Sequence, residues 1–227
     1  MAGGRMLETI FCFFAVVASC FIATPLKLLD SKVGGKCLLH GDVNSLTLNV
    51  TTGREIYCDL GFYSSITNGV IAIFLVFLRW CCLISQSSLI YGSLFSFILA
   101  TLCWINSVVC TVFMVVGFTE WCKSIKNTGK ITSCRDAQDL DWSKYSPQPL
   151  DGSMFHTYLS MVEISCYCTV AVWFLVALMC GKQLRQWLEE ASYDQDAEFI
   201  DGHTYLPQQH PMAMYGPGND FNRVTHL

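Results

Sequence analysis

The sequence predicts an all-α membrane protein: a four-helix transmembrane bundle with a small disulfide-braced β-rich lumenal or extracellular head and a disordered cytosolic tail. Three observations support this prediction. The 227 residues are 52% hydrophobic and 14% charged, which is far from the balance of a soluble domain. Four apolar stretches reach the length of about 20 residues that a helix needs to cross the hydrocarbon core. Four cysteines also lie in the polar loops between these stretches, two in each large loop.

Each predicted span is bounded by charged or turn-forming residues. The spans cover residues 7–26, 61–83, 89–118 and 154–181. The first stretch has one feature of a cleaved signal peptide, because Arg5 precedes it and Ser19 ends an acceptable cleavage site. Apolar residues continue beyond that site, however, and exceed a signal core of about 7–15 residues. A retained helix is therefore favoured.

The segments outside the spans differ in length and character. Residues 1–6 form a short N-terminus, and residues 84–88 form a turn that pairs the second and third helices as a hairpin. Residues 27–60 and 119–153 form two large polar loops. Residues 182–227 form a tail with a short amphipathic helix, then acidic and Pro- and Gly-rich segments typical of disorder.

The large loops contain several segments with strand character. In the first loop, Lys36–His40, Leu46–Thr51 and Glu55–Cys58 are rich in strand-forming residues and are separated by turn-forming ones. In the second loop, Lys130–Cys134 has weaker strand character and is a candidate edge strand. These segments predict a small sheet on top of the bundle.

Two rules disagree about which side of the membrane the large loops face. The loops carry most of the Lys and Arg residues, and the positive-inside rule would therefore place them in the cytosol. Paired loop cysteines instead indicate an oxidising compartment, and Asn49 begins an N-glycosylation acceptor sequence. The loop cysteines are Cys37, Cys58, Cys122 and Cys134. We therefore expect a multi-pass protein of the secretory pathway, in the plasma membrane or endosomes, with both termini cytosolic.

The pairing of the four loop cysteines has three possible solutions. Local pairs within each loop require the least ordering of the chain. A three-stranded meander, however, would place Cys37 and Cys58 on strands that are not neighbours, so pairing between the loops stays open.

The second loop resembles a known family. Val116–Ile125 (VGFTEWCKSI) and Ser133–Leu140 (SCRDAQDL), supported by Gly35–Leu39 (GKCLL), are similar to the transmembrane protein 179 family. Further residues that resemble its 179B form are Cys58, Phe155, Leu159 and Glu163. The resemblance implies a four-pass protein with both ends cytosolic, and it implies no activity. The chain also has the general plan of claudin-like tetraspan proteins, without their Gly-Leu-Trp signature or the Cys-Cys-Gly loop of tetraspanins.

Three polar residues lie at similar depth in the predicted spans. Counted from the loop side at 1.5 Å per residue, Asn68, Glu163 and Asn106 lie about 12, 15 and 17 Å deep. We expect them to form an intramembrane polar cluster, with Ser107 able to join. The favoured interpretation is a polar clasp between helices. The alternative is an ion or proton site in which Glu163 binds the charge and the two amides supply oxygen ligands.

Two further features are candidate modification or binding sites. Cys81, Cys82 and Cys180 lie near the cytosolic ends of helices, where cysteines can be palmitoylated, although they also suit a helix as small apolar residues. The last residues include Thr225 and Leu227, which match a PDZ ligand with a free terminal carboxylate.

No motif in the sequence indicates catalysis, and we expect no enzyme activity and no cofactor. His40 and His156 lack partnered nucleophiles, and Cys166 and Cys168 face different sides of a helix, which disfavours a metal site. No basic patch indicates nucleic-acid binding. We expect a non-enzymatic accessory subunit that lies in the lipid bilayer and associates laterally with another membrane protein. The alternative is a small ion or proton transporter or channel that uses the polar cluster.

Overall fold

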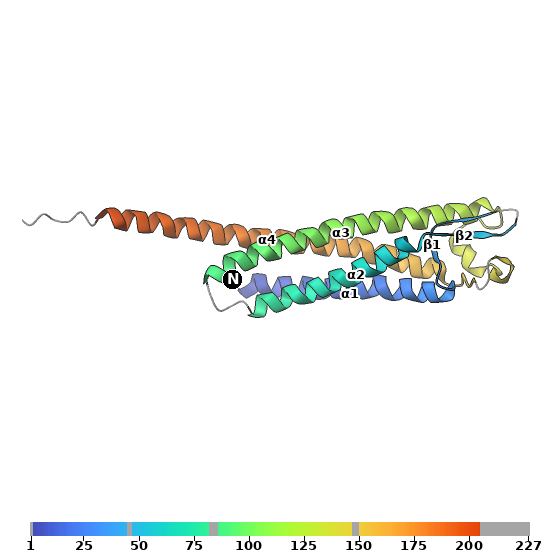
Figure 1. Ribbon diagram of the computed structural model, residues 1–227, viewed down its shortest axis with the longest axis horizontal. Helices are drawn as coiled ribbons and strands as arrows, with labels where there is room; N and C mark the ends of the chain where they lie inside the picture. The colour runs from blue at the N-terminus through green and yellow to red at the C-terminus, as the bar shows by residue number, and fades with distance from the viewer. Residues whose placement is uncertain (1, 45–46, 82–85, 147–149, 205–227) are drawn as a thin grey trace, which may run out of the picture. The chain divides into compact units, whose positions relative to one another are not determined.

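The computed structural model describes residues 2–44, 47–81, 86–146 and 150–204. Within these ranges the chain forms four long helices, two short strands and two short 3-10 helices (Figure 1). The helices are α1 (Ala2–Lys32), α2 (Glu55–Cys81), α3 (Gln86–Asn127) and α4 (Phe155–Thr204). The strands are β1 (Cys37–Val43) and β2 (Val50–Gly53), and the 3-10 helices are η1 (Arg135–Asp139) and η2 (Trp142–Lys144). The chain divides into two units, Met1–Leu188 and Glu189–Leu227.

All four helices are long and apolar enough to span a membrane, which confirms the predicted bundle. Among the described residues, the segments with this character are Met6–Lys32, Glu55–Trp80, Tyr91–Asn127 and Phe155–Glu190. Each extends past the predicted stretch at one end or at both, because a helix continues through polar residues when one of its faces still packs. α4 continues from the fourth span through residue 204. Residues 205–227 lie outside the described part.

We call residues 33–54 and 119–154 the head. In Figure 1 the two strands lie at one end of the bundle, beside the last turns of α3. β1 and β2 pair antiparallel, with Cys37 opposite Gly53 and Val43 opposite Val50, and a bulge shifts the register between these pairs. Two predictions were wrong: Glu55–Cys58 forms the first turn of α2, and Lys130–Cys134 forms bends before η1.

The buried core continues from the bundle into the head. At the head end it contains Trp121 and Phe155, which are both fully buried, with ring centroids 6.3 Å apart. Leu38 and Leu39 of β1 belong to the same cluster, as does Trp142 of η2. Because one cluster joins both parts, the head is packed against the helices and does not hang from a linker.

The helices approach closely where their side chains are small. Gly69 of α2 faces Ser19 of α1, and a Cβ atom at Gly69 would lie 3.3 Å from the Ser19 Cβ atom. The Ser19 hydroxyl donates to the Ala15 carbonyl at 2.8 Å, so its proton is satisfied within α1. Small residues of this kind let membrane helices gain dispersion contacts, since hydrophobic exclusion does not drive association in lipid.

Candidate functional site

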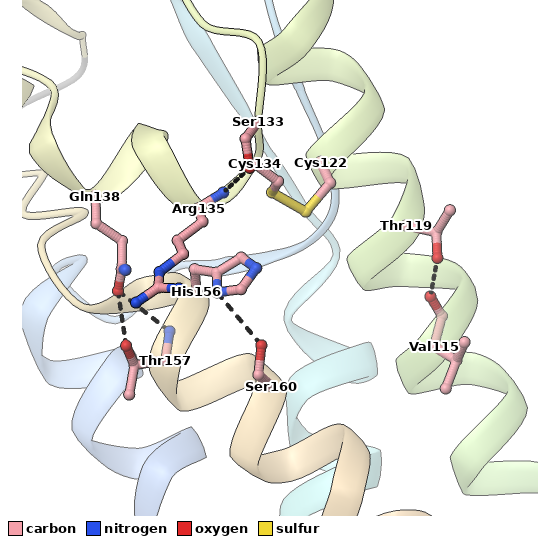
Figure 2. Close-up of a disulfide and its surroundings, with 10 residues drawn as sticks. All are labelled: Val115, Thr119, Cys122, Ser133, Cys134, Arg135, Gln138, His156, Thr157 and Ser160. Atoms are coloured by element: carbon pink, nitrogen blue, oxygen red, sulfur yellow. Dashed lines mark hydrogen bonds between the residues drawn. A yellow bond between two sulfur atoms is a disulfide. The ribbon is translucent and has the colours of Figure 1, made fainter.

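Two local disulfides brace the head, which confirms the expected disulfide bonding and decides the pairing. Cys37 bonds Cys58 and Cys122 bonds Cys134. The first bond is possible because Cys58 lies in the opening of α2, next to β1, and not on a third strand. Figure 2 shows the second bond, which ties η1 and its preceding bends to the last turns of α3.

The bulged strand β1 is tied to α3 by polar side chains. Ser124 of α3 donates a short hydrogen bond to the Asp42 carboxylate, and its hydroxyl accepts from the Val43 backbone N–H at 2.6 Å. His40 has a φ of 57° and lies with its Nδ1 atom 2.5 Å from a carboxylate oxygen of Glu120. The bulge is thus held in place by contacts with a helix of the bundle.

The second large loop is attached to the start of α4. The Gln138 amide oxygen accepts hydrogen bonds from the Thr157 backbone N–H at 3.2 Å and from its hydroxyl at 2.9 Å (Figure 2). Asp151 accepts hydrogen bonds from Ser153 and lies 3.5 Å from Lys32 at the end of α1. The Ser153 donors, with the Lys32 charge, lower the pKa of Asp151 from its ordinary value. These contacts fix the loop at the base of the head.

Asn68 and Asn106 join α2 to α3 inside the bundle. The Asn68 Nδ2 atom donates to the Ser107 hydroxyl at 3.0 Å, and the Asn106 Nδ2 atom donates to the Ser64 hydroxyl at 2.7 Å. The Asn106 Nδ2 atom also donates to the Asn68 Oδ1 atom at 3.3 Å. Each amide therefore bonds to the neighbouring helix, which is how polar side chains hold membrane helices together. We call Ser64, Asn68, Asn106 and Ser107 the clasp.

Glu163 does not belong to the clasp, so the predicted meeting of all three residues is wrong. Its side chain is half-buried on α4 and makes no hydrogen bond or ion pair with any residue that the structure describes. The buried face of α4 contains Leu159, Val162 and Cys166 at spacings of three and four. Glu163 lies one turn from Leu159 and from Cys166, about 40° and 60° around the helix, so it lies at the edge of that face. Matching depth along the bundle did not bring Glu163 into hydrogen-bond contact with the clasp.

The space on the side of the clasp that faces the interior of the bundle is very small. It has a volume of about 10 Å³ and is lined by residues that include Asn68, Ser107 and Thr169. A cavity needs at least about 10–15 Å³ to hold one water molecule. A hydrated ion does not fit in this space.

A second polar cluster, which the sequence did not predict, joins α1, α2 and α4 at the end of the bundle opposite the head. The Arg79 Nε atom lies 3.0 Å from a Glu8 carboxylate oxygen, and Glu8 is 1% exposed. Gln183 donates to the other Glu8 oxygen at 3.1 Å and accepts a short hydrogen bond from Arg79. The sequence did contain a signal for this cluster. The first apolar stretch carries an acidic residue, Glu8, and the second carries a basic residue, Arg79, near the same face of the membrane.

The predicted palmitoylation sites have different outcomes. Cys180 is fully buried, and its thiol donates to Glu8 at 3.5 Å. This cysteine faces the second cluster and not the lipid, so the prediction of acylation at Cys180 is corrected. Cys81 is described only as the last residue of α2, and Cys82 lies outside the described residues, as do the PDZ-ligand residues Thr225 and Leu227.

A groove of about 490 Å³ opens toward the lipid between α2 and α3. The walls include Leu60, Tyr63 and Thr67 of α2 and Leu102, Cys103 and Asn106 of α3. Most of the wall is apolar, and the clasp supplies its polar floor. Among the described residues, no group of three or more His, Cys, Asp or Glu side chains is placed to hold a metal ion.

The four spans and the disulfide-braced head define a four-pass membrane protein. Comparison with family models gives a match over residues 5–200 to the transmembrane protein 179/179B claudin domain. The chain therefore belongs to the transmembrane protein 179/179B family, which confirms the resemblance seen in the second loop. Comparisons with curated proteins and with solved structures find no match.

Proposed function

We propose that this protein is a non-enzymatic accessory subunit that associates laterally with another membrane protein and presents its head on the lumenal or extracellular side. The observation that carries the proposal is the firm attachment of the head to the bundle through two disulfides and one continuous core. A head packed in this way has a defined surface relative to the membrane. Such a surface is what an accessory subunit needs in order to contact a partner both in the bilayer and beyond it.

The intramembrane polar residues support this proposal over transport. The clasp residues bond to one another across α2 and α3, and the acidic residue that an ion site would use, Glu163, makes no hydrogen bond with any described residue. Transport sites usually combine several charges with interrupted helices. The helices here are continuous through the clasp.

Association with a partner is tested by mild detergent extraction and affinity purification of the full chain, followed by native mass spectrometry. We expect one membrane protein to be retained at a fixed stoichiometry. Glu163→Gln should change its recovery less than about twofold, because Glu163 makes no hydrogen bond with any described residue. A chain that elutes alone from every detergent tested would contradict the proposal. Proton or ion flux in liposomes that Glu163→Gln abolishes would favour a transporter instead.

The proposed orientation predicts glycosylation of Asn49, which is exposed on the head beside β2. Treatment with an N-glycanase should increase the mobility of the wild-type chain by one glycan and leave Asn49→Gln unchanged. The matched control is Asn44→Gln, because Asn44 is also exposed on the head but begins no acceptor sequence. Labelling of the reduced head cysteines by an impermeant thiol reagent only after the plasma membrane is permeabilised, in cells that carry the chain at their surface, would reverse the orientation.

A further inference from the structure

Aromatic pairs bridge α2 and α3 near both ends of the lipid-facing groove. Tyr57 and Phe113 stack near its head end, with ring centroids 6.3 Å apart. Phe74 and Phe95 meet edge to face beyond the other end at 6.4 Å. The lining residues of α2 run from Ile56 to Ile71, which corresponds to about 22 Å of helix. Four turns of a second helix would match this length.

The floor of the groove has an unused hydrogen-bond acceptor. Both hydrogen bonds that Asn106 makes use its Nδ2 atom, and its Oδ1 atom accepts from no residue that the structure describes. Asn106 is only half-buried and lines the groove, so this acceptor is placed where an occupant of the groove can reach it. In hydrocarbon there is no water to pair with it, and an unpaired amide group is costly. The groove thus favours an occupant that brings a hydrogen-bond donor to this point.

Depth decides which kind of occupant can bring that donor. Asp59 lies at the head end of the groove, and Asn68, the clasp partner of Asn106, lies nine residues further along α2. This separation is about 14 Å, roughly half of a hydrocarbon core about 30 Å thick. Lipid headgroups and sterol hydroxyls stay near the interface, whereas a transmembrane helix carries side chains at every depth. Small wall residues, Ser64, Thr67 and Cys103, permit a helix to approach closely.

We propose that the groove between α2 and α3 binds a transmembrane helix of the partner protein, and that a Ser, Thr, Asn or Gln side chain of this helix donates a hydrogen bond to the Asn106 Oδ1 atom. This inference rests on the proposed function as an accessory subunit, and it assigns the surface and the chemistry of the contact. In the free chain the walls of the groove are exposed: Leu60 is 40% exposed, Tyr63 63% and Leu102 56%. Binding of the helix would bury these side chains.

The test uses a photoreactive amino acid in place of Leu102, which lies in the groove, and in place of Ile164, which is 64% exposed on α4 outside the groove. In cells that express the full chain, position 102 should cross-link to a transmembrane helix of the partner, close to a Ser, Thr, Asn or Gln residue. Position 164 should give no cross-link to that helix. Cross-links from position 102 only to lipid, or to a second copy of this chain, would overturn the inference.

A second measurement separates this inference from the proposed function. In the Leu102→Trp variant the larger side chain occupies the groove, and it does not disturb the core because position 102 is exposed. This variant should lower recovery of the partner about tenfold. Ile164→Trp, the matched control, should leave recovery unchanged, and both variants should unfold at the same temperature as the wild-type chain. Full recovery with Leu102→Trp would overturn the groove contact while leaving the accessory role intact. A wild-type chain that retains no partner at all would overturn both.

Discussion

Replacing Arg79 by alanine is expected to destabilise the folded protein by about 3–5 kcal/mol, because it leaves the Glu8 carboxylate buried without its positive partner. The Glu8 side chain is 2% exposed and that of Arg79 is 16% exposed, so water screens the pair very little. Gln183 can still donate one hydrogen bond to Glu8 but brings no charge. The loss should also loosen three helices at once, since the cluster joins α1, α2 and α4.

The measurement is the unfolding free energy in mixed micelles, with loss of the monodisperse species on size-exclusion chromatography after heating as a second readout. Lys27→Ala is the matched control: it breaks the solvent-screened pair of Lys27 with Asp30, which are 2.8 Å apart, and should change the unfolding free energy little. The double variant Glu8→Met with Arg79→Leu should recover most of the stability, because it removes both charges. Equal stability of Arg79→Ala and Lys27→Ala would contradict the role of the cluster.

Removal of the disulfide between Cys37 and Cys58 should have the next largest effect. With a sequence separation of 21 residues, the bond is expected to contribute about 3 kcal/mol, chiefly by restricting the unfolded chain. Cys37 is buried at the start of β1 and Cys58 lies in the first turn of α2, so the bond also fixes the sheet to the bundle. Cys37→Ser with Cys58→Ser should therefore lower the melting temperature and reduce export of the protein from the endoplasmic reticulum.

The control for this prediction is Cys168→Ser, which alters a free, exposed cysteine outside the head and should change the melting temperature little. A reductant added to the wild-type protein should reproduce most of the effect of the double variant and have less effect on the variant itself. If the double variant melts with the wild-type protein, the head does not depend on the bond.

The spans could be predicted because hydrocarbon imposes a length and an apolar composition that no loop satisfies. The end of α3 could not be placed by the same rule, since Thr119–Asn127 is largely polar. A different signal was available there: Phe118, Trp121 and Ile125 are spaced three and four residues apart and are all buried. High hydropathy identifies the part of a helix that lies in the membrane. The spacing of apolar residues by three and four identifies the part of α3 that leaves the membrane and packs against the head.

The polar clusters show a similar difference. The depth of a residue in the membrane can be counted from the sequence, whereas the residues that its side chain contacts cannot. Residue counting placed Asn68 and Asn106 at matching depths, and they meet. The same counting included Glu163, which makes no hydrogen bond with either amide, and left out Glu8, which pairs with Arg79. The pairing of Cys37 with Cys58 was undecided for a related reason, because Glu55–Cys58 has strand-forming residues but folds as helix once α2 packs on α1.

The length of α3 has a mechanical consequence. Its 42 residues form one uninterrupted rod about 60 Å long, roughly twice the thickness of the hydrocarbon core. β1 and the second disulfide are fastened to the far end of that rod. A thinner bilayer would change the tilt of α3, and the part of the head that is attached to the end of α3 would then move with it. Membrane thickness is in this way coupled to the position of a surface that lies outside the membrane.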